Sequence, residues 1–359
     1  MRVLQVKLGT RSYPIRIVRE DLSQAGAALA ELNGEARIAL LSDERVDSLY
    51  GDTLRQSLDE AKLAHQSLML QRGERNKRPK AVSRIWQWLL ENHYDRRRTL
   101  IVALGGGIVG DVAGFAAATY MRGVDYAHFP TTLLAQVDSS VGGKTGVNLA
   151  DAKNAVGAFH QPRMVFASLQ TLRTLTVRDF RSGLAEVIKH GAIDGDSILN
   201  LIQQNHNAIL ARDPACMEAL VADCCLVKAR IVQQDERESG LRQLLNFGHS
   251  FGHAIEVASK HRVRHGEAVA LGMLAACHVS ERLGLCGVDV RHRLMELLTL
   301  VGLGTDLQPY WRSEIVDLMS RDKKMGGDSL NFVVAKSIGD LKVHALTLEE
   351  LRKITNDSI

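Results

Sequence analysis

The sequence has 359 residues and a net charge of +4, and 45% of its residues are hydrophobic. A chain of this length and composition can bury the core of one large or two ordinary globular domains. Its basic residues do not form blocks with interleaved aromatic residues, so we expect a small anionic substrate rather than nucleic acid as the partner.

The first part of the chain alternates apolar runs of strand length with helical patterns. In chain order the predicted segments are the strand 37–43, the helix 46–64, the strand 65–70, the turn 73–77, a helix around 85–90 and the strand 99–104. Strands that alternate with helices predict a parallel sheet. We therefore expect a Rossmann-like α/β domain in this part of the chain.

A glycine-rich turn follows the strand 99–104. Gly105, Gly107 and Gly110 have the G-x-G-x-x-G spacing of turns whose backbone N–H groups hold a pyrophosphate at a helix N-terminus. The acidic residue expected about 20 residues later has no clear candidate, whereas Asp43 closes an earlier strand. The pattern favours dinucleotide binding and leaves the strand order open.

The segment Gly143-Lys144-Thr145 resembles the end of a Walker A motif, which needs a further glycine five positions before Gly143. That position is Asp138, whose carboxylate would repel phosphates, so we do not expect a nucleotide-hydrolysing P-loop. Lys144 and the pair Lys153-Asn154 remain candidates for binding an anion or a cofactor. The alternative is that they are solvated loop residues.

The pattern becomes helical after a connecting stretch at 162–176, with few strand signals before 330–335. Amphipathic segments run over 214–235 and 267–283, and Gly284 fits the C-terminal cap of the second. We therefore predict two domains, an α/β domain over 1–178 and an all-α domain over 179–359.

Histidines in the helical half have the spacing of a metal site. His249 and His253 share one helix face, each follows a glycine that permits a close approach, and His265 comes soon after. A catalytic zinc takes three protein ligands and keeps a position open. The best additional carboxylate is Glu186, in an apolar segment for which Ser182 is a plausible N-cap.

Five cysteines without a C-x-x-C pair argue against a disulfide framework. The first 13 residues alternate apolar and polar positions and do not resemble a signal peptide. No apolar run is long enough to span a bilayer. These features make the cytoplasm the expected location.

The chain resembles the 3-dehydroquinate synthase family through a series of motifs in the same order. These are Gly105-Gly106-Gly107-x-x-Gly110-Asp111, Pro130-Thr131-Thr132, Asp138-Ser139-Ser140-x-Gly142-Gly143-Lys144-Thr145, Lys153-Asn154, Ala185-Glu186-x-Ile188-Lys189, Leu245-Asn246-x-Gly248-His249-x-x-Gly252-His253, His265-Gly266-Glu267 and Asp322-Lys323-Lys324. The resemblance implies a cytoplasmic homodimer that binds NAD in the α/β domain. It also implies a divalent metal, zinc or cobalt, in the helical domain.

By this resemblance the metal ligands are Glu186, His249 and His265, and His253 becomes either a contact of the ligands or a substrate contact. On spacing alone, His190 and Glu256 remain rival ligands. The resemblance implies further substrate contacts at Lys144, Lys189, Lys228, Arg242, Asn246 and Lys323 or Lys324, with Arg122 reaching the active site of the partner subunit. It implies NAD contacts at Asp43, Gly73, Glu74, Lys77, Gly107, Ile108, Val109, Gly110, Asp111, Thr131, Thr132, Asp138, Lys144, Lys153, Asn154, Thr171, Leu172, Arg173 and Thr174.

The implied reaction converts 3-deoxy-D-arabino-heptulosonate 7-phosphate into 3-dehydroquinate and phosphate, a step of the shikimate pathway. It uses transient oxidation by NAD, phosphate elimination, re-reduction and an intramolecular aldol closure. The nearest rivals are cyclases that act on sedoheptulose 7-phosphate or on an amino substrate, which would not need Arg242 for a carboxylate. A metal-dependent polyol dehydrogenase and a non-catalytic NAD or metal sensor are further alternatives.

Overall fold

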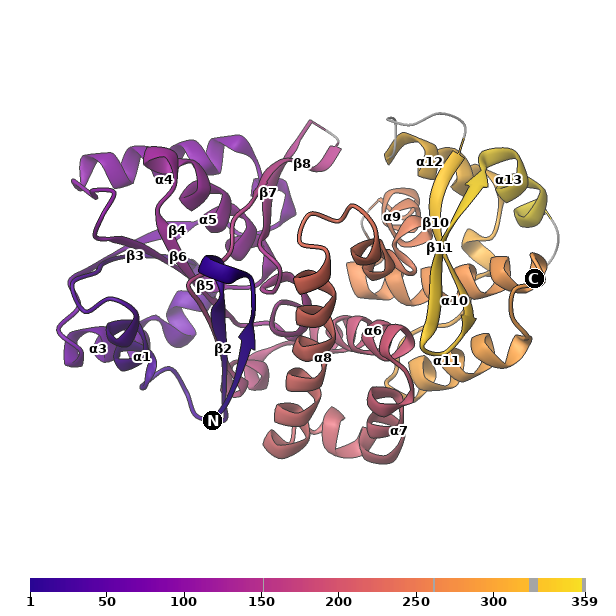
Figure 1. The fold of residues 1–359 in the computed structure, drawn as a ribbon, viewed down its shortest axis with the longest axis horizontal. Helices are drawn as coiled ribbons and strands as arrows, with labels where there is room; N and C mark the ends of the chain where they lie inside the picture. The colour runs from indigo at the N-terminus through magenta and orange to yellow at the C-terminus, as the bar shows by residue number, and fades with distance from the viewer. Residues whose placement is uncertain (151, 261, 323–328, 357–359) are drawn as a thin grey trace. The chain divides into compact units, whose positions relative to one another are not determined.

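The computed structural model describes residues 1–150, 152–260, 262–322 and 329–356. It forms two compact units (Figure 1). The first comprises Met1–Thr176 with Met217–Gln233, and the second comprises Val177–Cys216 with Gln234–Ile359. The domain boundary at residue 178 stays a prediction, and the structure adds that most of α8 (Pro214–Gln234) packs as part of the first unit.

A seven-stranded sheet forms the centre of the first unit, in the order β1-β2-β9-β6-β5-β3-β4. Only the edge strand β1 pairs antiparallel, and the others are parallel, which confirms the predicted parallel sheet. The strands are β1 (Arg2–Val6), β2 (Tyr13–Val18), β3 (Arg37–Asp43), β4 (His65–Leu70), β5 (Thr99–Gly105), β6 (Asp125–Pro130) and β9 (Met164–Ser168).

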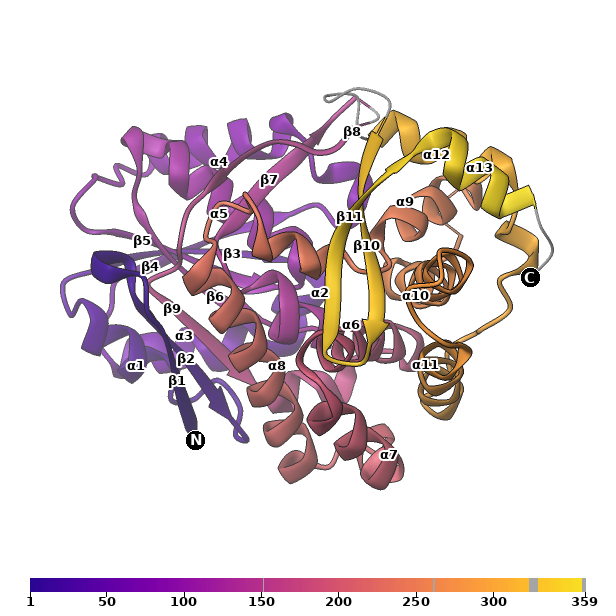
Figure 2. The ribbon, with the colours of Figure 1, turned by 45° about the vertical axis from the view of Figure 1, so that its right-hand side comes forward.

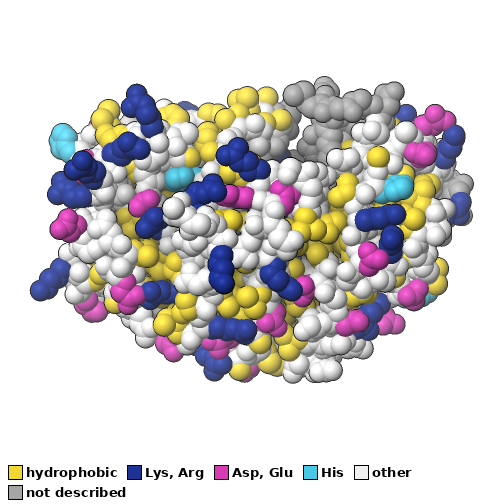
Figure 3. Space-filling view, in the orientation of Figure 1, with side chains coloured by type: hydrophobic (Ala, Val, Ile, Leu, Met, Phe, Trp, Pro, Cys, Tyr) yellow, Lys and Arg dark blue, Asp and Glu magenta, His cyan; other side chains and the backbone are white. Residues whose placement is uncertain are grey.

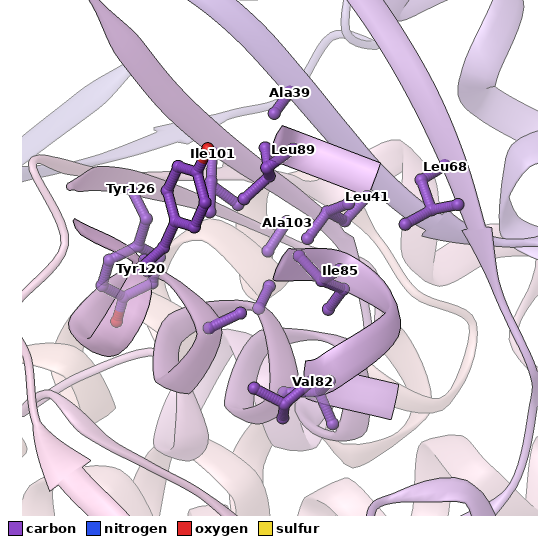
Figure 4. Close-up of a cluster of buried hydrophobic side chains, with 14 of the residues drawn as sticks. Ala39, Leu41, Leu68, Val82, Ile85, Leu89, Ile101, Ala103, Tyr120 and Tyr126 are labelled. Atoms are coloured by element: carbon purple, nitrogen blue, oxygen red, sulfur yellow. The ribbon is translucent and has the colours of Figure 1, made fainter. Parts of the chain in front are cut away.

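Helices cover both faces of this sheet, because its central strands are apolar on both sides. Ala39 and Ile101 pack with residues of α4 and α5 on one face (Figure 4), whereas their neighbours Ile38 and Leu100 pack with residues of α1 and α3 on the other. These helices are α1 (Ala25–Leu32), α3 (Asp52–Glu60), α4 (Pro79–Glu91) and α5 (Gly107–Thr119). The helix predicted over 46–64 is present as α2 (Glu44–Val46), a π-helical turn and α3, and it ends at Glu60.

Two segments of the first unit correct or complete the sequence prediction. The stretch 162–176 was expected to be a connection, but it contains β9, a fully buried strand between β2 and β6. Four consecutive apolar residues and a serine, all buried, carry no alternating pattern, so periodicity could not identify the strand. Lys144 begins the strand β7 (Lys144–Leu149), which forms a hairpin with β8 (Ala152–Phe159). A Walker A motif would instead continue into a helix.

The second unit is helical, as predicted, with one added β-hairpin (Figure 2). The almost wholly buried helix α10 forms its centre and packs against α6, α9, α11 and the hairpin strand β10. The elements are α6 (Val177–Asp194), α7 (Asp196–Leu210), α9 (His249–Ala258), α10 (His265–Arg282), α11 (Val288–Leu300), α12 (Ser313–Asp322), β10 (Ser329–Ser337), β11 (Asp340–Thr347) and α13 (Leu348–Asn356).

The surface carries mixed charges. On the face shown in Figure 3, Lys and Arg side chains are interspersed with Asp and Glu. In the described part of the chain, no helix has both the length and the apolar character needed to cross a membrane. All five cysteines are free thiols, and Cys224, Cys225 and Cys277 are buried.

Candidate metal and dinucleotide sites

Asp43 lies beside the glycine turn because β3 and β5 are parallel neighbours. Ser42 is in register with Leu104, and its hydroxyl donates a hydrogen bond to the Leu104 carbonyl at 2.9 Å. The chain leaves β3 toward β4 on one side and leaves β5 toward β6 on the other, so the strand order reverses here. Open parallel sheets bind ligands at such points. Asp43, at the end of the neighbouring strand β3, is thus the acidic residue for which the sequence downstream of the turn has no candidate.

The glycines of the turn pack closely against neighbouring side chains. A Cβ on Gly106 would lie 3.1 Å from Thr132 Cγ2, and a Cβ on Gly110 would lie 2.1 Å from His128 Cε1. Helix α5 starts at Gly107, and among the described residues no side chain caps this end. The first-turn N–H groups point along the helix axis toward the edge of the sheet, which is the arrangement that holds a pyrophosphate.

The other predicted dinucleotide contacts follow the carboxyl ends of the same parallel strands or lie on the hairpin beside them. This shared edge explains how residues distant in sequence come together. The residues after β4 are Gly73, Glu74 and Lys77, and those in α5 are Ile108, Val109 and Asp111. Thr131 and Thr132 follow β6, and Asp138 lies in the next turn. The hairpin strands β7 and β8 carry Lys144, Lys153 and Asn154, and the turn after β9 carries Thr171, Leu172, Arg173 and Thr174.

A hydrogen-bonded network ties three of these segments together. The buried Lys77 Nζ lies 2.5 Å from both Asp111 Oδ2 and Asn154 Oδ1. Burial raises the pKa of Asp111 above its ordinary value, and the ammonium of Lys77 opposes that shift. Asn148, which the sequence analysis did not select, donates to Glu74 Oε1 at 2.7 Å and accepts from the Asn154 N–H at 2.8 Å. In the sequence Asn148 stands between the apolar residues Val147 and Leu149, which is the signal that could have marked it.

Two predicted substrate contacts also belong to the first unit. Lys228 on α8 donates to both the carbonyl and the Oδ1 atom of Asp138 at 2.6 Å, which joins it to a predicted cofactor residue. Arg122 lies in an exposed turn with a left-handed backbone angle, φ +65°. Its role at a partner subunit stays a prediction.

The second unit brings Glu186, His249 and His265 together from α6, α9 and α10. Their ligand atoms all lie within 4.8 Å of one another. Glu186 Oε1 is 3.3 Å from His265 Nε2 and 3.7 Å from His249 Nε2, while Glu186 Oε2 is 2.5 Å from Lys189 Nζ. One carboxylate oxygen and two imidazole nitrogens form a donor set that fits a divalent metal with open coordination positions.

Glycines allow the helices to approach closely enough to form this site. A Cβ on Gly272 of α10 would lie 1.9 Å from the Gly248 carbonyl oxygen, and a Cβ on Gly252 would lie 3.3 Å from the Ala268 carbonyl. These contacts confirm the expected close approach. The prediction that Ser182 caps a helix was wrong, because α6 already begins at Val177 and Ser182 lies within it.

The imidazoles of His249 and His265 each present Nε2 to the Glu186 carboxylate. The other ring nitrogen of His249 lies 3.3 Å from the Phe247 carbonyl, which suits donation from Nδ1 and leaves Nε2 bare. Burial, and then the charge of Lys189, hold the pKa of His249 well below its ordinary value, so this ring is neutral and able to bind a metal. The pKa of His265 is raised to about 9, since the carboxylates of Glu186 and Glu256 outweigh the opposite effect of burial.

A second group of potential ligands overlaps the first. His253, Glu256 and His265 also have ligand atoms within 4.8 Å of one another. In this group His265 uses its Nδ1 atom, 3.6 Å from Glu256 Oε2. His190, the other rival on spacing, belongs to neither group of ligand atoms found among the described residues.

The remaining predicted substrate residues lie near α6 or outside the described residues. Arg242 and Asn246 belong to a 3-10 turn, Leu241–Asn246, that packs against α6, and Arg242 is 1% exposed. Asn246 donates to Glu238 Oε1 at 2.9 Å, and Glu238 was missed because nothing in its local sequence distinguishes it. Lys323 and Lys324 lie outside the described residues.

Comparisons with known proteins match almost the whole chain. The model of the 3-dehydroquinate synthase N-terminal region matches residues 67–182, and that of the C-terminal region matches 183–325. The chain is 42% identical to the 3-dehydroquinate synthase of Geotalea uraniireducens, covering 96% of this chain and 95% of the relative. It is 45% identical to that of Rhodospirillum rubrum, covering 94% and 89%. A solved structure of 2-epi-5-epi-valiolone synthase from Streptomyces hygroscopicus, with NAD+ and Zn2+ bound, is 26% identical with a TM-score of 0.87, covering 99% and 98%.

Proposed function

This chain belongs to the 3-dehydroquinate synthase family, and from that premise we infer that it converts 3-deoxy-D-arabino-heptulosonate 7-phosphate into 3-dehydroquinate and phosphate. The observation that carries the inference is the convergence of Glu186, His249 and His265, in a chain that matches its relatives over almost its whole length. We assign the enzyme to the carbon–oxygen lyases, because phosphate leaves by elimination.

We propose that Glu186, His249 and His265 hold a divalent metal, zinc or cobalt. Such a metal supplies Lewis acidity that lowers the pKa of a bound hydroxyl and polarises the ketone formed from it. Lys189 lies 2.5 Å from the second oxygen of Glu186, so its positive charge balances the charge of the carboxylate. The neutral form of His249 keeps its ring nitrogen available without first losing a proton.

We propose that NAD binds at the carboxyl edge of the sheet, with its pyrophosphate at the glycine turn and Asp43 at a ribose hydroxyl. The cofactor supplies hydride acceptance and return, so it is regenerated within one turnover. The chain's own contribution is position: Lys77 holds Asp111 and Asn154 at fixed distances, and Gly106 and Gly110 let the turn and α5 pack closely against Thr132 and His128.

We propose that the substrate's charged groups are held by basic side chains. The buried Arg242 has one guanidinium nitrogen donating to the Glu236 carbonyl, which fixes its plane for bidentate capture of a carboxylate. Lys144, Lys189, Lys228, Asn246, His253 and one of Lys323 and Lys324 bind the phosphate or the hydroxyl groups. The enzyme acts as a cytoplasmic homodimer in which Arg122 reaches the partner's active site.

Phosphate release tests this function directly. The purified protein, loaded with Zn2+ or Co2+ and supplied with less NAD than substrate, is expected to release phosphate over many turnovers without accumulating NADH. Stoichiometric NADH would indicate a polyol dehydrogenase. Release from sedoheptulose 7-phosphate, but not from the heptulosonate phosphate, would indicate a different cyclase. No release from either substrate would overturn the assignment.

A further inference from the structure

Glu256 is a buried carboxylate beside the candidate metal site that the proposed reaction does not use. It is 5% exposed and lies on α9, the helix that carries His249 and His253. Its Oε2 atom is 3.6 Å from Nδ1 of His265, the ring nitrogen that faces away from Glu186. A buried carboxylate is costly unless a donor or a cation compensates it, so its position next to His265 needs an explanation.

We propose that Glu256 is a positioning residue that holds His265 in the orientation and tautomer that bind the metal. This inference rests on the proposal that Glu186, His249 and His265 are the metal ligands. Glu256 is the acceptor that faces the Nδ1–H group of His265, which leaves Nε2 bare and facing Glu186 Oε1. It touches neither substrate nor metal.

The argument follows from the neutral form of His265, the form that binds a metal, in which the imidazole carries a single N–H. If that hydrogen were on Nε2, the ring would donate it to Glu186 Oε1, which is 3.3 Å away. One hydrogen bond would then occupy two of the three ligand atoms. An acceptor at Nδ1 favours the other tautomer, in which both ligand atoms stay available.

The second imidazole ligand supports this interpretation by its own geometry. His249 Nδ1 lies 3.3 Å from the Phe247 carbonyl while its Nε2 faces Glu186 Oε1. Each imidazole therefore has an oxygen at Nδ1 and presents Nε2 to the same carboxylate oxygen. For His249 the oxygen comes from the backbone, whereas for His265 it comes from Glu256.

The overlapping group of His253, Glu256 and His265 is the alternative, in which Glu256 is itself a ligand. That arrangement would turn Nδ1 of His265 toward the ion and separate Glu186 and His249 from it. Glu186 is 0% exposed and its Oε1 atom faces both His249 and His265, so the first arrangement places the cation against the more deeply buried carboxylate. The two arrangements predict different results for variants of Glu256.

Metal affinity is the test, measured on the metal-free protein by competition with a chromophoric chelator for Zn2+ and Co2+. We expect Glu256→Ala to weaken binding by about 10- to 100-fold, the usual effect of removing such a partner. Glu256→Gln, whose amide oxygen still accepts a hydrogen bond, should recover part of that loss. The visible absorption of bound Co2+ should keep its wild-type band shape in the Gln variant, because the ligands are unchanged.

Glu281→Gln is the matched control. Glu281 Oε2 lies 3.5 Å from His278 Nδ1 in another buried histidine–carboxylate contact, about 24 Å further along α10 from His265 at 1.5 Å per residue. We expect this variant to bind metal as the wild type does, even if it is less stable. Equal losses of affinity in Glu281→Gln and Glu256→Ala would show a general packing effect and overturn the inference.

Further outcomes separate this inference from the proposed metal site. If His265→Ala abolishes binding but Glu256→Ala binds as the wild type does, the positioning role is wrong and the metal site stands. If Glu256→Gln changes the Co2+ band shape, Glu256 is a ligand and the positioning role is again wrong. If His265→Ala retains wild-type affinity, the proposed ligand set itself is wrong, and the inference fails with it.

Discussion

The backbone N–H of Gly266 donates a hydrogen bond to Ser182 Oγ at 3.0 Å. The approach is so close that a Cβ on Gly266 would lie 1.9 Å from the Ser182 carbonyl oxygen. This contact joins α6, which carries Glu186, to the first turn of α10, which carries His265. A serine and a glycine that bind no ligand themselves therefore set the spacing of two candidate metal ligands.

We predict that Gly266→Ala pushes α6 and α10 apart. The expected loss is about 1 to 3 kcal/mol of unfolding free energy, typical of overpacking, together with weaker metal binding. Ser182→Ala removes only the hydrogen bond and should cost about 1 kcal/mol. Gly304→Ala is the control, since its Cβ would meet no heavy atom within 4 Å. Thermal unfolding and metal competition measure both effects, and unchanged metal affinity in Gly266→Ala would contradict the prediction.

Replacement of Lys189 tests the buried ion pair. Lys189→Met leaves the Glu186 carboxylate buried without this cation, which should destabilise the metal-free protein by about 3 to 5 kcal/mol. Added Zn2+ should reduce the loss, because a bound cation also compensates the carboxylate. Lys353→Met, which breaks an exposed pair with Glu349, should have little effect. Denaturant titrations with and without metal decide the matter, and a loss that Zn2+ does not reduce would argue against the site.

His128 should make the stability of the protein depend on pH. Burial lowers the pKa of His128 to about 4, from about 6.5 in an unfolded chain. As the pH falls from 6.5 to 4, the unfolded chain takes up a proton that the folded protein does not. Stability present above pH 6.5 is therefore lost as the pH falls toward 4, by about 3 kcal/mol at 1.36 kcal/mol per pKa unit.

His128→Gln should remove this part of the pH dependence, as measured by urea unfolding at a series of pH values. The exposed His292→Gln is the control for loss of an imidazole. Parallel stability curves for the wild type and His128→Gln between pH 4 and pH 6.5 would refute the prediction.

Asp43 has two roles that substitution can separate. Its carboxylate accepts hydrogen bonds from the Arg45 and Val46 N–H groups and so caps α2, and we propose that it also holds a ribose hydroxyl. Asp43→Asn keeps a capping side chain but loses the charge, so NAD should bind about tenfold more weakly with little change in stability. Asp43→Ala should in addition lose about 1 kcal/mol of stability. Calorimetric titration with NAD measures the first effect, and wild-type affinity in Asp43→Asn would rule out the ribose contact.

Local pattern in the sequence was enough to predict the parallel sheet, the glycine turn and the helical second half. Apolar runs and their spacing are properties of neighbouring residues, so they can be recognised without any knowledge of the fold. Strand β9 was not predicted for the same reason, because a short strand that is buried on both faces has no periodicity to detect.

The candidate ligand residues could be selected from the sequence, but their arrangement could not. Spacing alone left His253, His190 and Glu256 as rivals, since i+3 and i+4 neighbours on one helix are equivalent until another helix packs against them. The packing of α6, α9 and α10 decides which ring nitrogen of His265 faces Glu186 and which faces Glu256.

The sequence by itself determined which residue types occur and on which elements they lie. Only the tertiary structure decided that Asp43 lies beside the glycine turn, that Ser182 bonds to Gly266 rather than capping a helix, and that most of α8 packs with the first unit. The physical reason is that strand order and helix packing depend on contacts between residues far apart in the chain, and such contacts leave no local pattern.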